Sequence, residues 1–210
     1  MHGAQQLSLR AVARELGMAS SAIYRYFPSR DELLTALIID AYDSLGASAE
    51  AAEGAVARAD IRGRWRATCG AVRNWALAHP HEYALIYGSP VPGYEAPQAT
   101  IGPAGRVALV IGSVLADAWN SAWAASAMNR QEPRPLPPML AGQAALVAAA
   151  IAPEVPATVI TRGLVAWTQL FGMISFELFR QLKGTVDPAD DFFAYTVELM
   201  ADIIGLQEPG

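Results

Sequence analysis

Apolar residues recur every three or four positions along most of the chain, which is the spacing of an amphipathic α-helix. The strict alternation of apolar and polar residues that marks a half-buried strand is not found in the sequence. The pattern therefore predicts an all-α protein. The capping residues, glycines and prolines between the periodic segments predict where its helices begin and end.

Two short helices are predicted near the N-terminus. The first covers residues 9–16, with Ser8 at the N-cap position and Gly17 where a left-handed terminator belongs. The second covers residues 20–26 and ends before Pro28, which cannot continue a helix. Two short helices joined by a glycine-containing turn have the spacing of a helix-turn-helix.

A long helix is predicted next, because Ser29 and Glu32 have the spacing of a capping box. The apolar residues that follow repeat at three and four positions: Leu33, Leu34, Leu37, Ile38, Ala41, Tyr42 and Leu45. The segment from Ala47 to Ala57 holds few large apolar residues, so we place a domain boundary there. This predicts a small N-terminal domain of residues 1–46 and a larger domain of residues 47–210.

The larger domain is predicted to consist of helices separated by loops rich in proline and glycine, the longest of which covers residues 88–105. The predicted helices cover residues 61–79, 81–87, 104–128, 138–151 and 158–182, with a last helix that begins at Asp187 and Pro188.

Composition narrows the class of protein. Hydrophobic residues make up 53% of the chain, which favours an apolar cavity, a hydrophobic oligomer interface, or both. The longest stretch without a charge, residues 135–153, is broken by prolines, which argues against a membrane-spanning helix. Residues 1–6 do not resemble a secretory signal, and the single cysteine has no partner for a disulfide. We therefore expect a cytoplasmic protein with no membrane partner.

Charge is distributed unevenly along the chain. Residues 1–30 contain four arginines and one glutamate, a net charge of +3, whereas the whole chain carries −5 and the remaining residues therefore carry −8. A basic end on an acidic protein is what is needed if only that end approaches phosphates.

The segment from Leu7 to Leu34 combines several specific motifs. They are a serine that opens the first predicted helix, an Ala-x-x-Leu-Gly turn, an Ile-Tyr-x-x-Phe second helix, and a Pro-Ser-Arg-x-x-Leu entry to the long helix. This combination closely resembles the DNA-binding signature of the TetR family of transcriptional regulators. The resemblance implies a helix-turn-helix for double-stranded operator DNA, joined to a larger helical domain that binds a small molecule and dimerises.

The predicted recognition helix begins with small residues that let its backbone approach base edges in the major groove: Ser20, Ser21 and Ala22. It continues with donors for phosphate oxygens: Tyr24, Arg25 and Tyr26. Arg25 can alternatively reach a guanine edge. The resemblance implies that Ser8 bonds a phosphate, that Arg10 enters the groove and reads a base, and that Arg30 grips the DNA backbone. The alternative is that these side chains form only a solvated helix face.

Members of this family carry a full helix before the segment that begins here at Leu7, and only six residues precede it. We therefore expect the first helix of the family to be missing, which would leave apolar surface of the helix-turn-helix uncovered. The alternative function is accordingly a helical small-molecule-binding or scaffold protein that has lost DNA binding.

A Trp-x-x-x-His-Pro element, formed by Trp75, His79 and Pro80, resembles a subgroup of the same family. The aromatic residues of the larger domain suit a pocket for a small apolar or aromatic ligand, and Cys69 stands among them as an inert thiol. We expect the ligand site to consist of Trp65, Cys69, Tyr87, Trp119, Trp123, Trp167 and Phe171. The alternative is that most of these residues are ordinary core.

The last two predicted helices are too apolar to face water on every side. Two such helices from each of two subunits can bury their faces in a four-helix bundle, the homodimer that the resemblance also implies. The expected interface consists of Phe176, Phe192, Thr196, Leu199 and Ile203. The alternative is that both helices form the core of a monomer.

Motifs of enzyme chemistry do not stand out in the sequence. His79, His81 and Glu82 lack the spacing of a metal cage, and neither a nucleophile elbow nor a phosphate-cradling glycine loop is present. We therefore expect no metal, no cofactor and no enzyme activity. The predicted function is a ligand-responsive transcriptional regulator, a repressor, that binds a near-palindromic operator as a homodimer.

Overall fold

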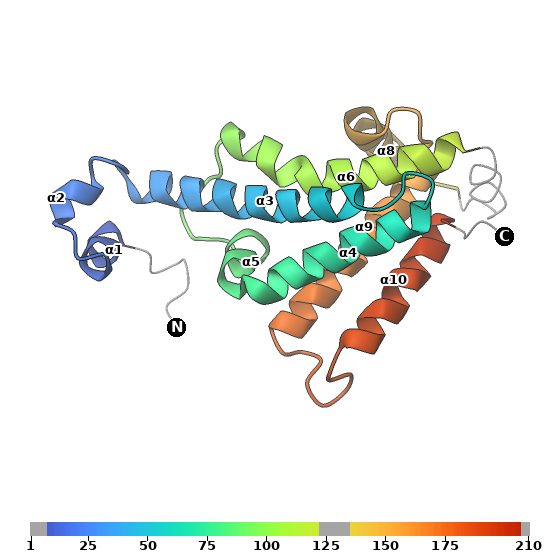
Figure 1. The fold of residues 1–210 in the computed structure, drawn as a ribbon. Helices are drawn as coiled ribbons and strands as arrows, with labels where there is room; N and C mark the ends of the chain where they lie inside the picture. Colours follow the sequence, from blue (N-terminus) through green and yellow to red (C-terminus); the bar gives the residue numbers. More distant parts are fainter. Residues whose placement is uncertain (1–7, 122–134, 207–210) are drawn as a thin grey trace.

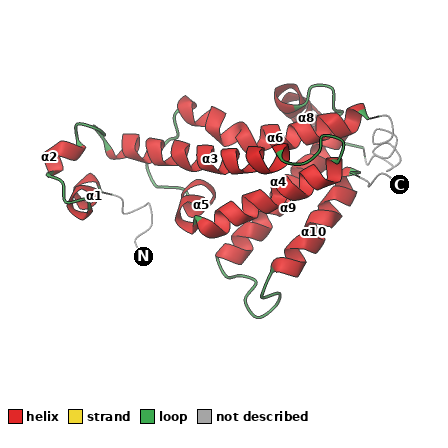
Figure 2. Cartoon of the chain, in the orientation of Figure 1, coloured by secondary structure: helices red, strands yellow, loops and turns green. Residues whose placement is uncertain are grey.

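The computed structural model describes residues 8–121 and 135–206 (Figure 1). Helices joined by loops make up both ranges, and no strand occurs within them (Figure 2). This confirms the predicted all-α class. The helices are α1 (Leu9–Glu15), α2 (Ser20–Ile23), α3 (Arg30–Gly54), α4 (Ile61–Ala78), α5 (Pro80–Tyr87), α6 (Ile101–Asn120), α8 (Pro138–Ile151), α9 (Ala157–Leu178) and α10 (Asp190–Ile204), with a 3₁₀ turn, η2 (Gln98–Thr100), before α6.

Local signals in the sequence set several helix ends. The hydroxyl of Ser29 accepts a hydrogen bond from the backbone N–H of Glu32 at 3.1 Å, which is the capping contact that the motif predicts. Gly17 follows α1 with φ of 66°, a left-handed conformation that glycine adopts without steric cost. The largest difference is at the end of α3, which continues past Leu45 to Gly54 through an alanine-rich segment of high helix propensity.

Residues 8–30, which we call the head, lie at one end of the long helix α3 (Figure 1). Helix α3 runs from the head into the rest of the described chain, which we call the body. The head has a small core of its own: Leu9, Ala13 and Ile23 are buried against Leu33 of α3, with Val12, Met18 and Phe27 packed around them.

The body is a bundle in which α3 packs against α4 and α6, and α9 packs against α8 and α10. Its core is much larger than that of the head and draws on nearly every helix. Fully buried side chains include Leu45, Trp65, Leu115, Ile174 and Met200. Burial of side chains of this size is the main stabilising contribution to such a fold.

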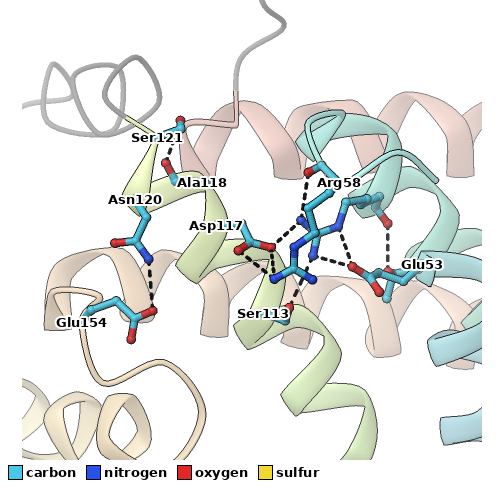
Figure 3. Close-up of polar contacts among 10 residues, drawn as sticks. Glu53, Arg58, Ser113, Asp117, Ala118, Asn120, Ser121 and Glu154 are labelled. Atoms are coloured by element: carbon cyan, nitrogen blue, oxygen red, sulfur yellow. Dashed lines mark hydrogen bonds and ion pairs between the residues drawn. The ribbon is translucent and has the colours of Figure 1, made fainter. Parts of the chain in front are cut away.

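A buried arginine joins three helices, and its partners Glu53, Ser113 and Asp117 are labelled in Figure 3. Arg64 of α4 is only 1% exposed. It donates to Glu53 of α3 at 2.5 Å, to Asp117 of α6 at 2.6 Å and to Ser113 of α6 at 3.3 Å. Because each polar group of the guanidinium has a partner, the charge is tolerated inside the bundle.

Other arginines of the body join helices in the same way. Arg106 of α6 donates to Asp43 and Glu50 of α3, over Gly46, where a Cβ atom would lie only 2.7 Å from the arginine side chain. These contacts and those of Arg64 engage the part of α3 beyond Leu45. They give a physical reason why α3 continues as one helix instead of ending there.

By length and composition alone, two described helices could cross a membrane: Gln98–Asn120, which includes η2, and Ala157–Leu178. Both contribute to the core of the body, where Leu115 of α6 lies against Gly163 of α9. An apolar helix that packs inside a bundle passes the same test of composition as a membrane helix.

Candidate DNA-binding surface and ligand cavity

The turn between α1 and α2 orients the outward face of the head. The backbone N–H of Met18 donates to the carbonyl of Ala13 at 2.8 Å, which closes the turn after Gly17. After α2 the chain continues in turns, with Tyr26 and Phe27 both donating to the carbonyl of Ile23. Ile23 is 3% exposed, so the apolar positions of this segment point into the head and the others point out.

The predicted DNA-contacting residues lie together on the head. Most of their side chains are exposed: Ser8, Arg10, Ser21, Tyr24, Arg25 and Tyr26. Ala22 and Arg30 are half-buried, and Arg30 lies 4.0 Å from Asp31. Ser20 occupies the first position of α2. Ser8 stands at the N-cap of α1 without a side-chain capping bond.

The arginines of the head differ from those of the body. Arg10, Arg14 and Arg25 make no ion pair within residues 8–121 and 135–206. In the body, a carboxylate oxygen lies within 4.0 Å of each of Arg58, Arg62, Arg64, Arg66, Arg73 and Arg106. Three exposed arginines without an ion pair among the described residues therefore lie in the head, where they can attract a polyanion, while Arg180 and Lys183, which follow α9, are exposed in the same way.

Two residues of the predicted ligand site lie in tightly packed core. Trp65 and Cys69 are fully buried, and the indole N–H of Trp65 donates to the carbonyl of Val197 at 3.0 Å. Burial raises the pKa of the Cys69 thiol, which keeps the thiol protonated and unreactive. These contacts give both residues a structural role between α4 and α10.

Three other predicted ligand residues belong to a chain of aromatic rings in contact with one another. Trp167 and Phe171 of α9 have ring centroids 4.6 Å apart, and Phe171 lies 4.3 Å from Tyr87 of α5. Tyr87 in turn contacts Tyr42 of α3 edge-on at 6.0 Å and Tyr83 at 5.2 Å. The sequence pattern does not single out Tyr42 as a site residue, because it is simply one position of the apolar stripe of α3.

A cavity of about 110 Å³ lies between α6, α8 and α9. It is lined by Ala108, Ile111, Leu115, Val147, Ile151, Ile160, Gly163, Leu164 and Trp167. Trp167 is the one residue that this lining shares with the predicted ligand site. Trp119 is partly buried near the end of α6, and Trp123 lies outside the described residues.

The Trp-His-Pro element has a clear structural role. The imidazole of His79 stacks on Trp75 with ring centroids 5.1 Å apart, and the indole N–H of Trp75 donates to Ser44 of α3 at 2.8 Å. Pro80 then opens α5, where a missing N–H costs nothing. The element therefore sets the corner between α4 and α5 against α3. Within the described residues, no group of three His, Cys, Asp or Glu side chains could hold a metal ion.

The last two helices expose apolar side chains in rows of helical spacing. Of the residues predicted to form the dimer interface, Phe176 is 55% exposed, and Phe192, Leu199 and Ile203 are also exposed. Thr196 is buried within its own chain, where its hydroxyl donates to the carbonyl of Phe192. The same rows include exposed residues that the sequence pattern did not indicate: Val165, Phe179 and Tyr195.

Comparisons with known proteins agree with this architecture. The family model of the bacterial regulatory proteins of the tetR family matches residues 1–37, and that of the tetracyclin repressor-like C-terminal domain matches residues 65–200. The chain is 38% identical over 203 residues to the HTH-type transcriptional regulators Rv1816 of Mycobacterium tuberculosis and Mb1846 of Mycobacterium bovis. The aligned region covers 95% of this chain and 85% of each relative.

Solved structures have the same fold. The crystal structure of SCO4313, which is assigned as a regulatory protein, superposes with a TM-score of 0.68 at 33% identity, covering 95% of this chain and 87% of that one. A protein of unknown function from Rhodococcus sp. RHA1 has a TM-score of 0.65 at 24% identity, covering 95% and 85%, and supports the fold alone. On the two family matches, the curated relatives and the helix-turn-helix at its N-terminal end, this chain belongs to the TetR family of transcriptional regulators.

Proposed function

We propose that this regulator binds a near-palindromic operator as a homodimer in the cytoplasm, and that a small apolar ligand in the body releases it from DNA. The observation that carries the DNA-binding part is the contrast between arginines. Six arginines of the body lie beside carboxylates, whereas Arg10, Arg14 and Arg25 of the head are exposed and make no ion pair within the described ranges.

In this proposal the N-terminal end of α2 enters the major groove. Its small residues Ser21 and Ala22 let the backbone come close to base edges, and Arg10 of α1 reads a base. Phosphates are contacted by Ser8, Tyr24, Arg25, Tyr26 and Arg30. The alternative that these side chains are merely solvated predicts no sequence preference.

The exposed rows of α9 and α10 are proposed to form the dimer interface. Phe176, Leu199 and Ile203 are large apolar side chains that a single chain leaves in water. Pairing them with the same helices of a second copy would bury them in an isologous four-helix bundle.

Helix α3 is the proposed connection between ligand and DNA. It begins at the head and continues through the body to Gly54, so a shift of α3 against the other helices of the body changes the separation of two heads in a dimer (Figure 1). Because the two heads must span successive major grooves about 34–36 Å apart, a small change of separation weakens binding. This makes repression relieved by ligand the expected mode.

Selection of bound sequences from a pool of random double-stranded DNA tests the proposal directly, because the protein itself picks out its operator. We expect a two-fold symmetric motif whose half-sites are one helical turn apart or a multiple of it, with affinity that falls steeply as salt rises. Retention without any enriched motif, or no retention, would favour the alternative of a helical ligand-binding protein that does not read DNA.

A further inference from the structure

The cavity between α6, α8 and α9 is framed by two glycines that bring its helices together. A Cβ atom on Gly112 of α6 would lie 2.6 Å from the carbonyl oxygen of Ile151 in α8. A Cβ atom on Gly163 of α9 would lie 3.0 Å from a methyl group of Leu115 in α6. These glycines permit close backbone approach on either side of the cavity, whereas the space between is left unfilled.

The side chains of the cavity wall are hydrocarbon apart from the indole of Trp167. A ligand with a hydroxyl or a charge would have to give up water without gaining a partner, which is unfavourable. An engineered apolar cavity of about 150 Å³ binds benzene, so a volume of about 110 Å³ fits a molecule of that size or slightly smaller. The lining thus selects for compact molecules without hydrogen-bonding groups.

We propose that this cavity is the effector site of the regulator and that it takes a compact, uncharged hydrocarbon-like or halocarbon-like molecule. The inference rests on the proposed function and makes it specific. It moves the site from the buried Trp65 and Cys69 to the space beside Trp167, and it narrows the expected small apolar or aromatic ligand to a compact molecule without polar groups.

A continuous path of rings leads from this cavity to the helix that carries the head. Trp167 lies in the cavity wall and contacts Phe171, which contacts Tyr87, which contacts Tyr42 of α3. Rings packed in this way cannot move independently. A ligand that displaces Trp167 therefore also shifts the rings that contact α3. This gives the cavity a physical connection to DNA binding.

The test uses 1-bromopropane, a small apolar molecule whose bromine quenches tryptophan fluorescence at contact, titrated into the full chain. We expect saturable quenching, which benzene reverses by competition and which 2-bromoethanol, carrying a hydroxyl group, does not reproduce at the same concentrations. Trp167→Phe should abolish the quenching while benzene still binds by calorimetry.

A substitution that fills the cavity, paired with the same substitution outside it, tests whether the ligand binds there. Ala108→Leu puts extra methyl groups into the cavity and should raise the dissociation constant of 1-bromopropane about tenfold or more. Ala145→Leu makes the same chemical change at an exposed position of α8 and should leave it unchanged. Quenching that is equal in both variants, or that needs no Trp167, would overturn the site.

Operator binding separates this inference from the proposed function. With the selected operator, benzene should weaken binding by wild type and by Ala145→Leu, and have no effect on Ala108→Leu. Benzene binding in the cavity with unchanged operator affinity would overturn the effector role. Failure to bind any DNA, with the cavity still occupied by benzene, would instead refute the proposed DNA-binding function.

Discussion

The head and the body of this regulator are held together by different means. The head buries three apolar side chains, Leu9, Ala13 and Ile23, against Leu33 of α3, and most of its charged groups remain in water. The body buries a core that spans nearly all of its helices and uses its arginines as internal ties. Six arginines of the body therefore join its helices through ion pairs, whereas Arg10, Arg14 and Arg25 of the head make no such pair among the described residues.

The difference also bears on stability. A small core contributes little free energy of folding by itself, so the head depends on its attachment to Leu33 of α3. Local opening of the head should therefore need less free energy than unfolding of the body. The following substitutions are designed to break or sharpen this contrast.

The largest effect is expected at the buried ion cluster of the body. Arg64→Ala leaves Glu53 and Asp117 without their buried partner and should lower the free energy of unfolding by about 3–5 kcal/mol. Arg58→Ala removes an exposed arginine from the same Asp117 and should cost less than about 1 kcal/mol. Urea denaturation of both variants measures the difference, and equal losses would mean that the buried cluster adds nothing beyond a surface pair.

A matched pair of core truncations compares the two regions directly. Ile23→Ala in the head and Ile174→Ala in the body each remove the same buried atoms, at a cost of about 2–5 kcal/mol. We expect Ile23→Ala to speed amide hydrogen exchange in the head alone, whereas Ile174→Ala should lower the global unfolding midpoint. If Ile23→Ala lowered protection equally throughout the body, head and body would be one cooperative unit.

Substitutions of a base-reading arginine and of a backbone-contacting arginine in the head should have different effects on operator binding. Arg10→Ala should cost about 1–3 kcal/mol of operator affinity and relax the preference at one base position. Arg30→Ala should weaken all sequences alike and reduce the slope of log affinity against log salt by about one. Anisotropy titrations against the operator and point-mutated versions measure both. Similar losses of specificity in the two variants would contradict these roles.

The smallest effect concerns acid stability. Hydrogen bonds from Arg66, and then from Arg62, hold the pKa of Glu198 below its ordinary value of 4.5. These pairs therefore stabilise the folded chain above that pH, and the stabilisation is lost as the pH falls through the lower pKa of the folded state. Glu198→Gln should make the free energy of unfolding fall less steeply as the pH is lowered into the acid range. Glu82→Gln, at an exposed position of α5, should leave this pH dependence unchanged.

Sequence reasoning succeeded where the signal is local. The left-handed Gly17 and the Ser29 cap each depend on residues within one turn, and both are confirmed. It ended α3 too early because the alanine-rich segment after Leu45 lacks large apolar residues, and the contacts that hold this segment to the body come from residues far along the chain, Arg64 and Arg106.

The same limit applies to the candidate sites. Period alone cannot tell which apolar side of α10 faces its own chain, so Thr196 was grouped with the exposed Leu199 although it points inward. Nor can it tell a filled core from a cavity, since Trp65 and Trp167 both stand in long predicted helices and only the latter borders open space. The motif residues of the head were found because their pattern is compact in sequence.

The central claim is that the body, through α9 and α10, holds two heads at a fixed separation on DNA. Anisotropy titration of the selected operator and of the same operator with five base pairs inserted between its half-sites tests this directly, because the insertion turns one half-site to the opposite face of the duplex. We expect wild type to lose about 100-fold or more in affinity on the insertion, and Leu199→Glu to bind both DNAs as weakly as wild type binds the insertion. Equal affinity of wild type for the two DNAs would contradict the account.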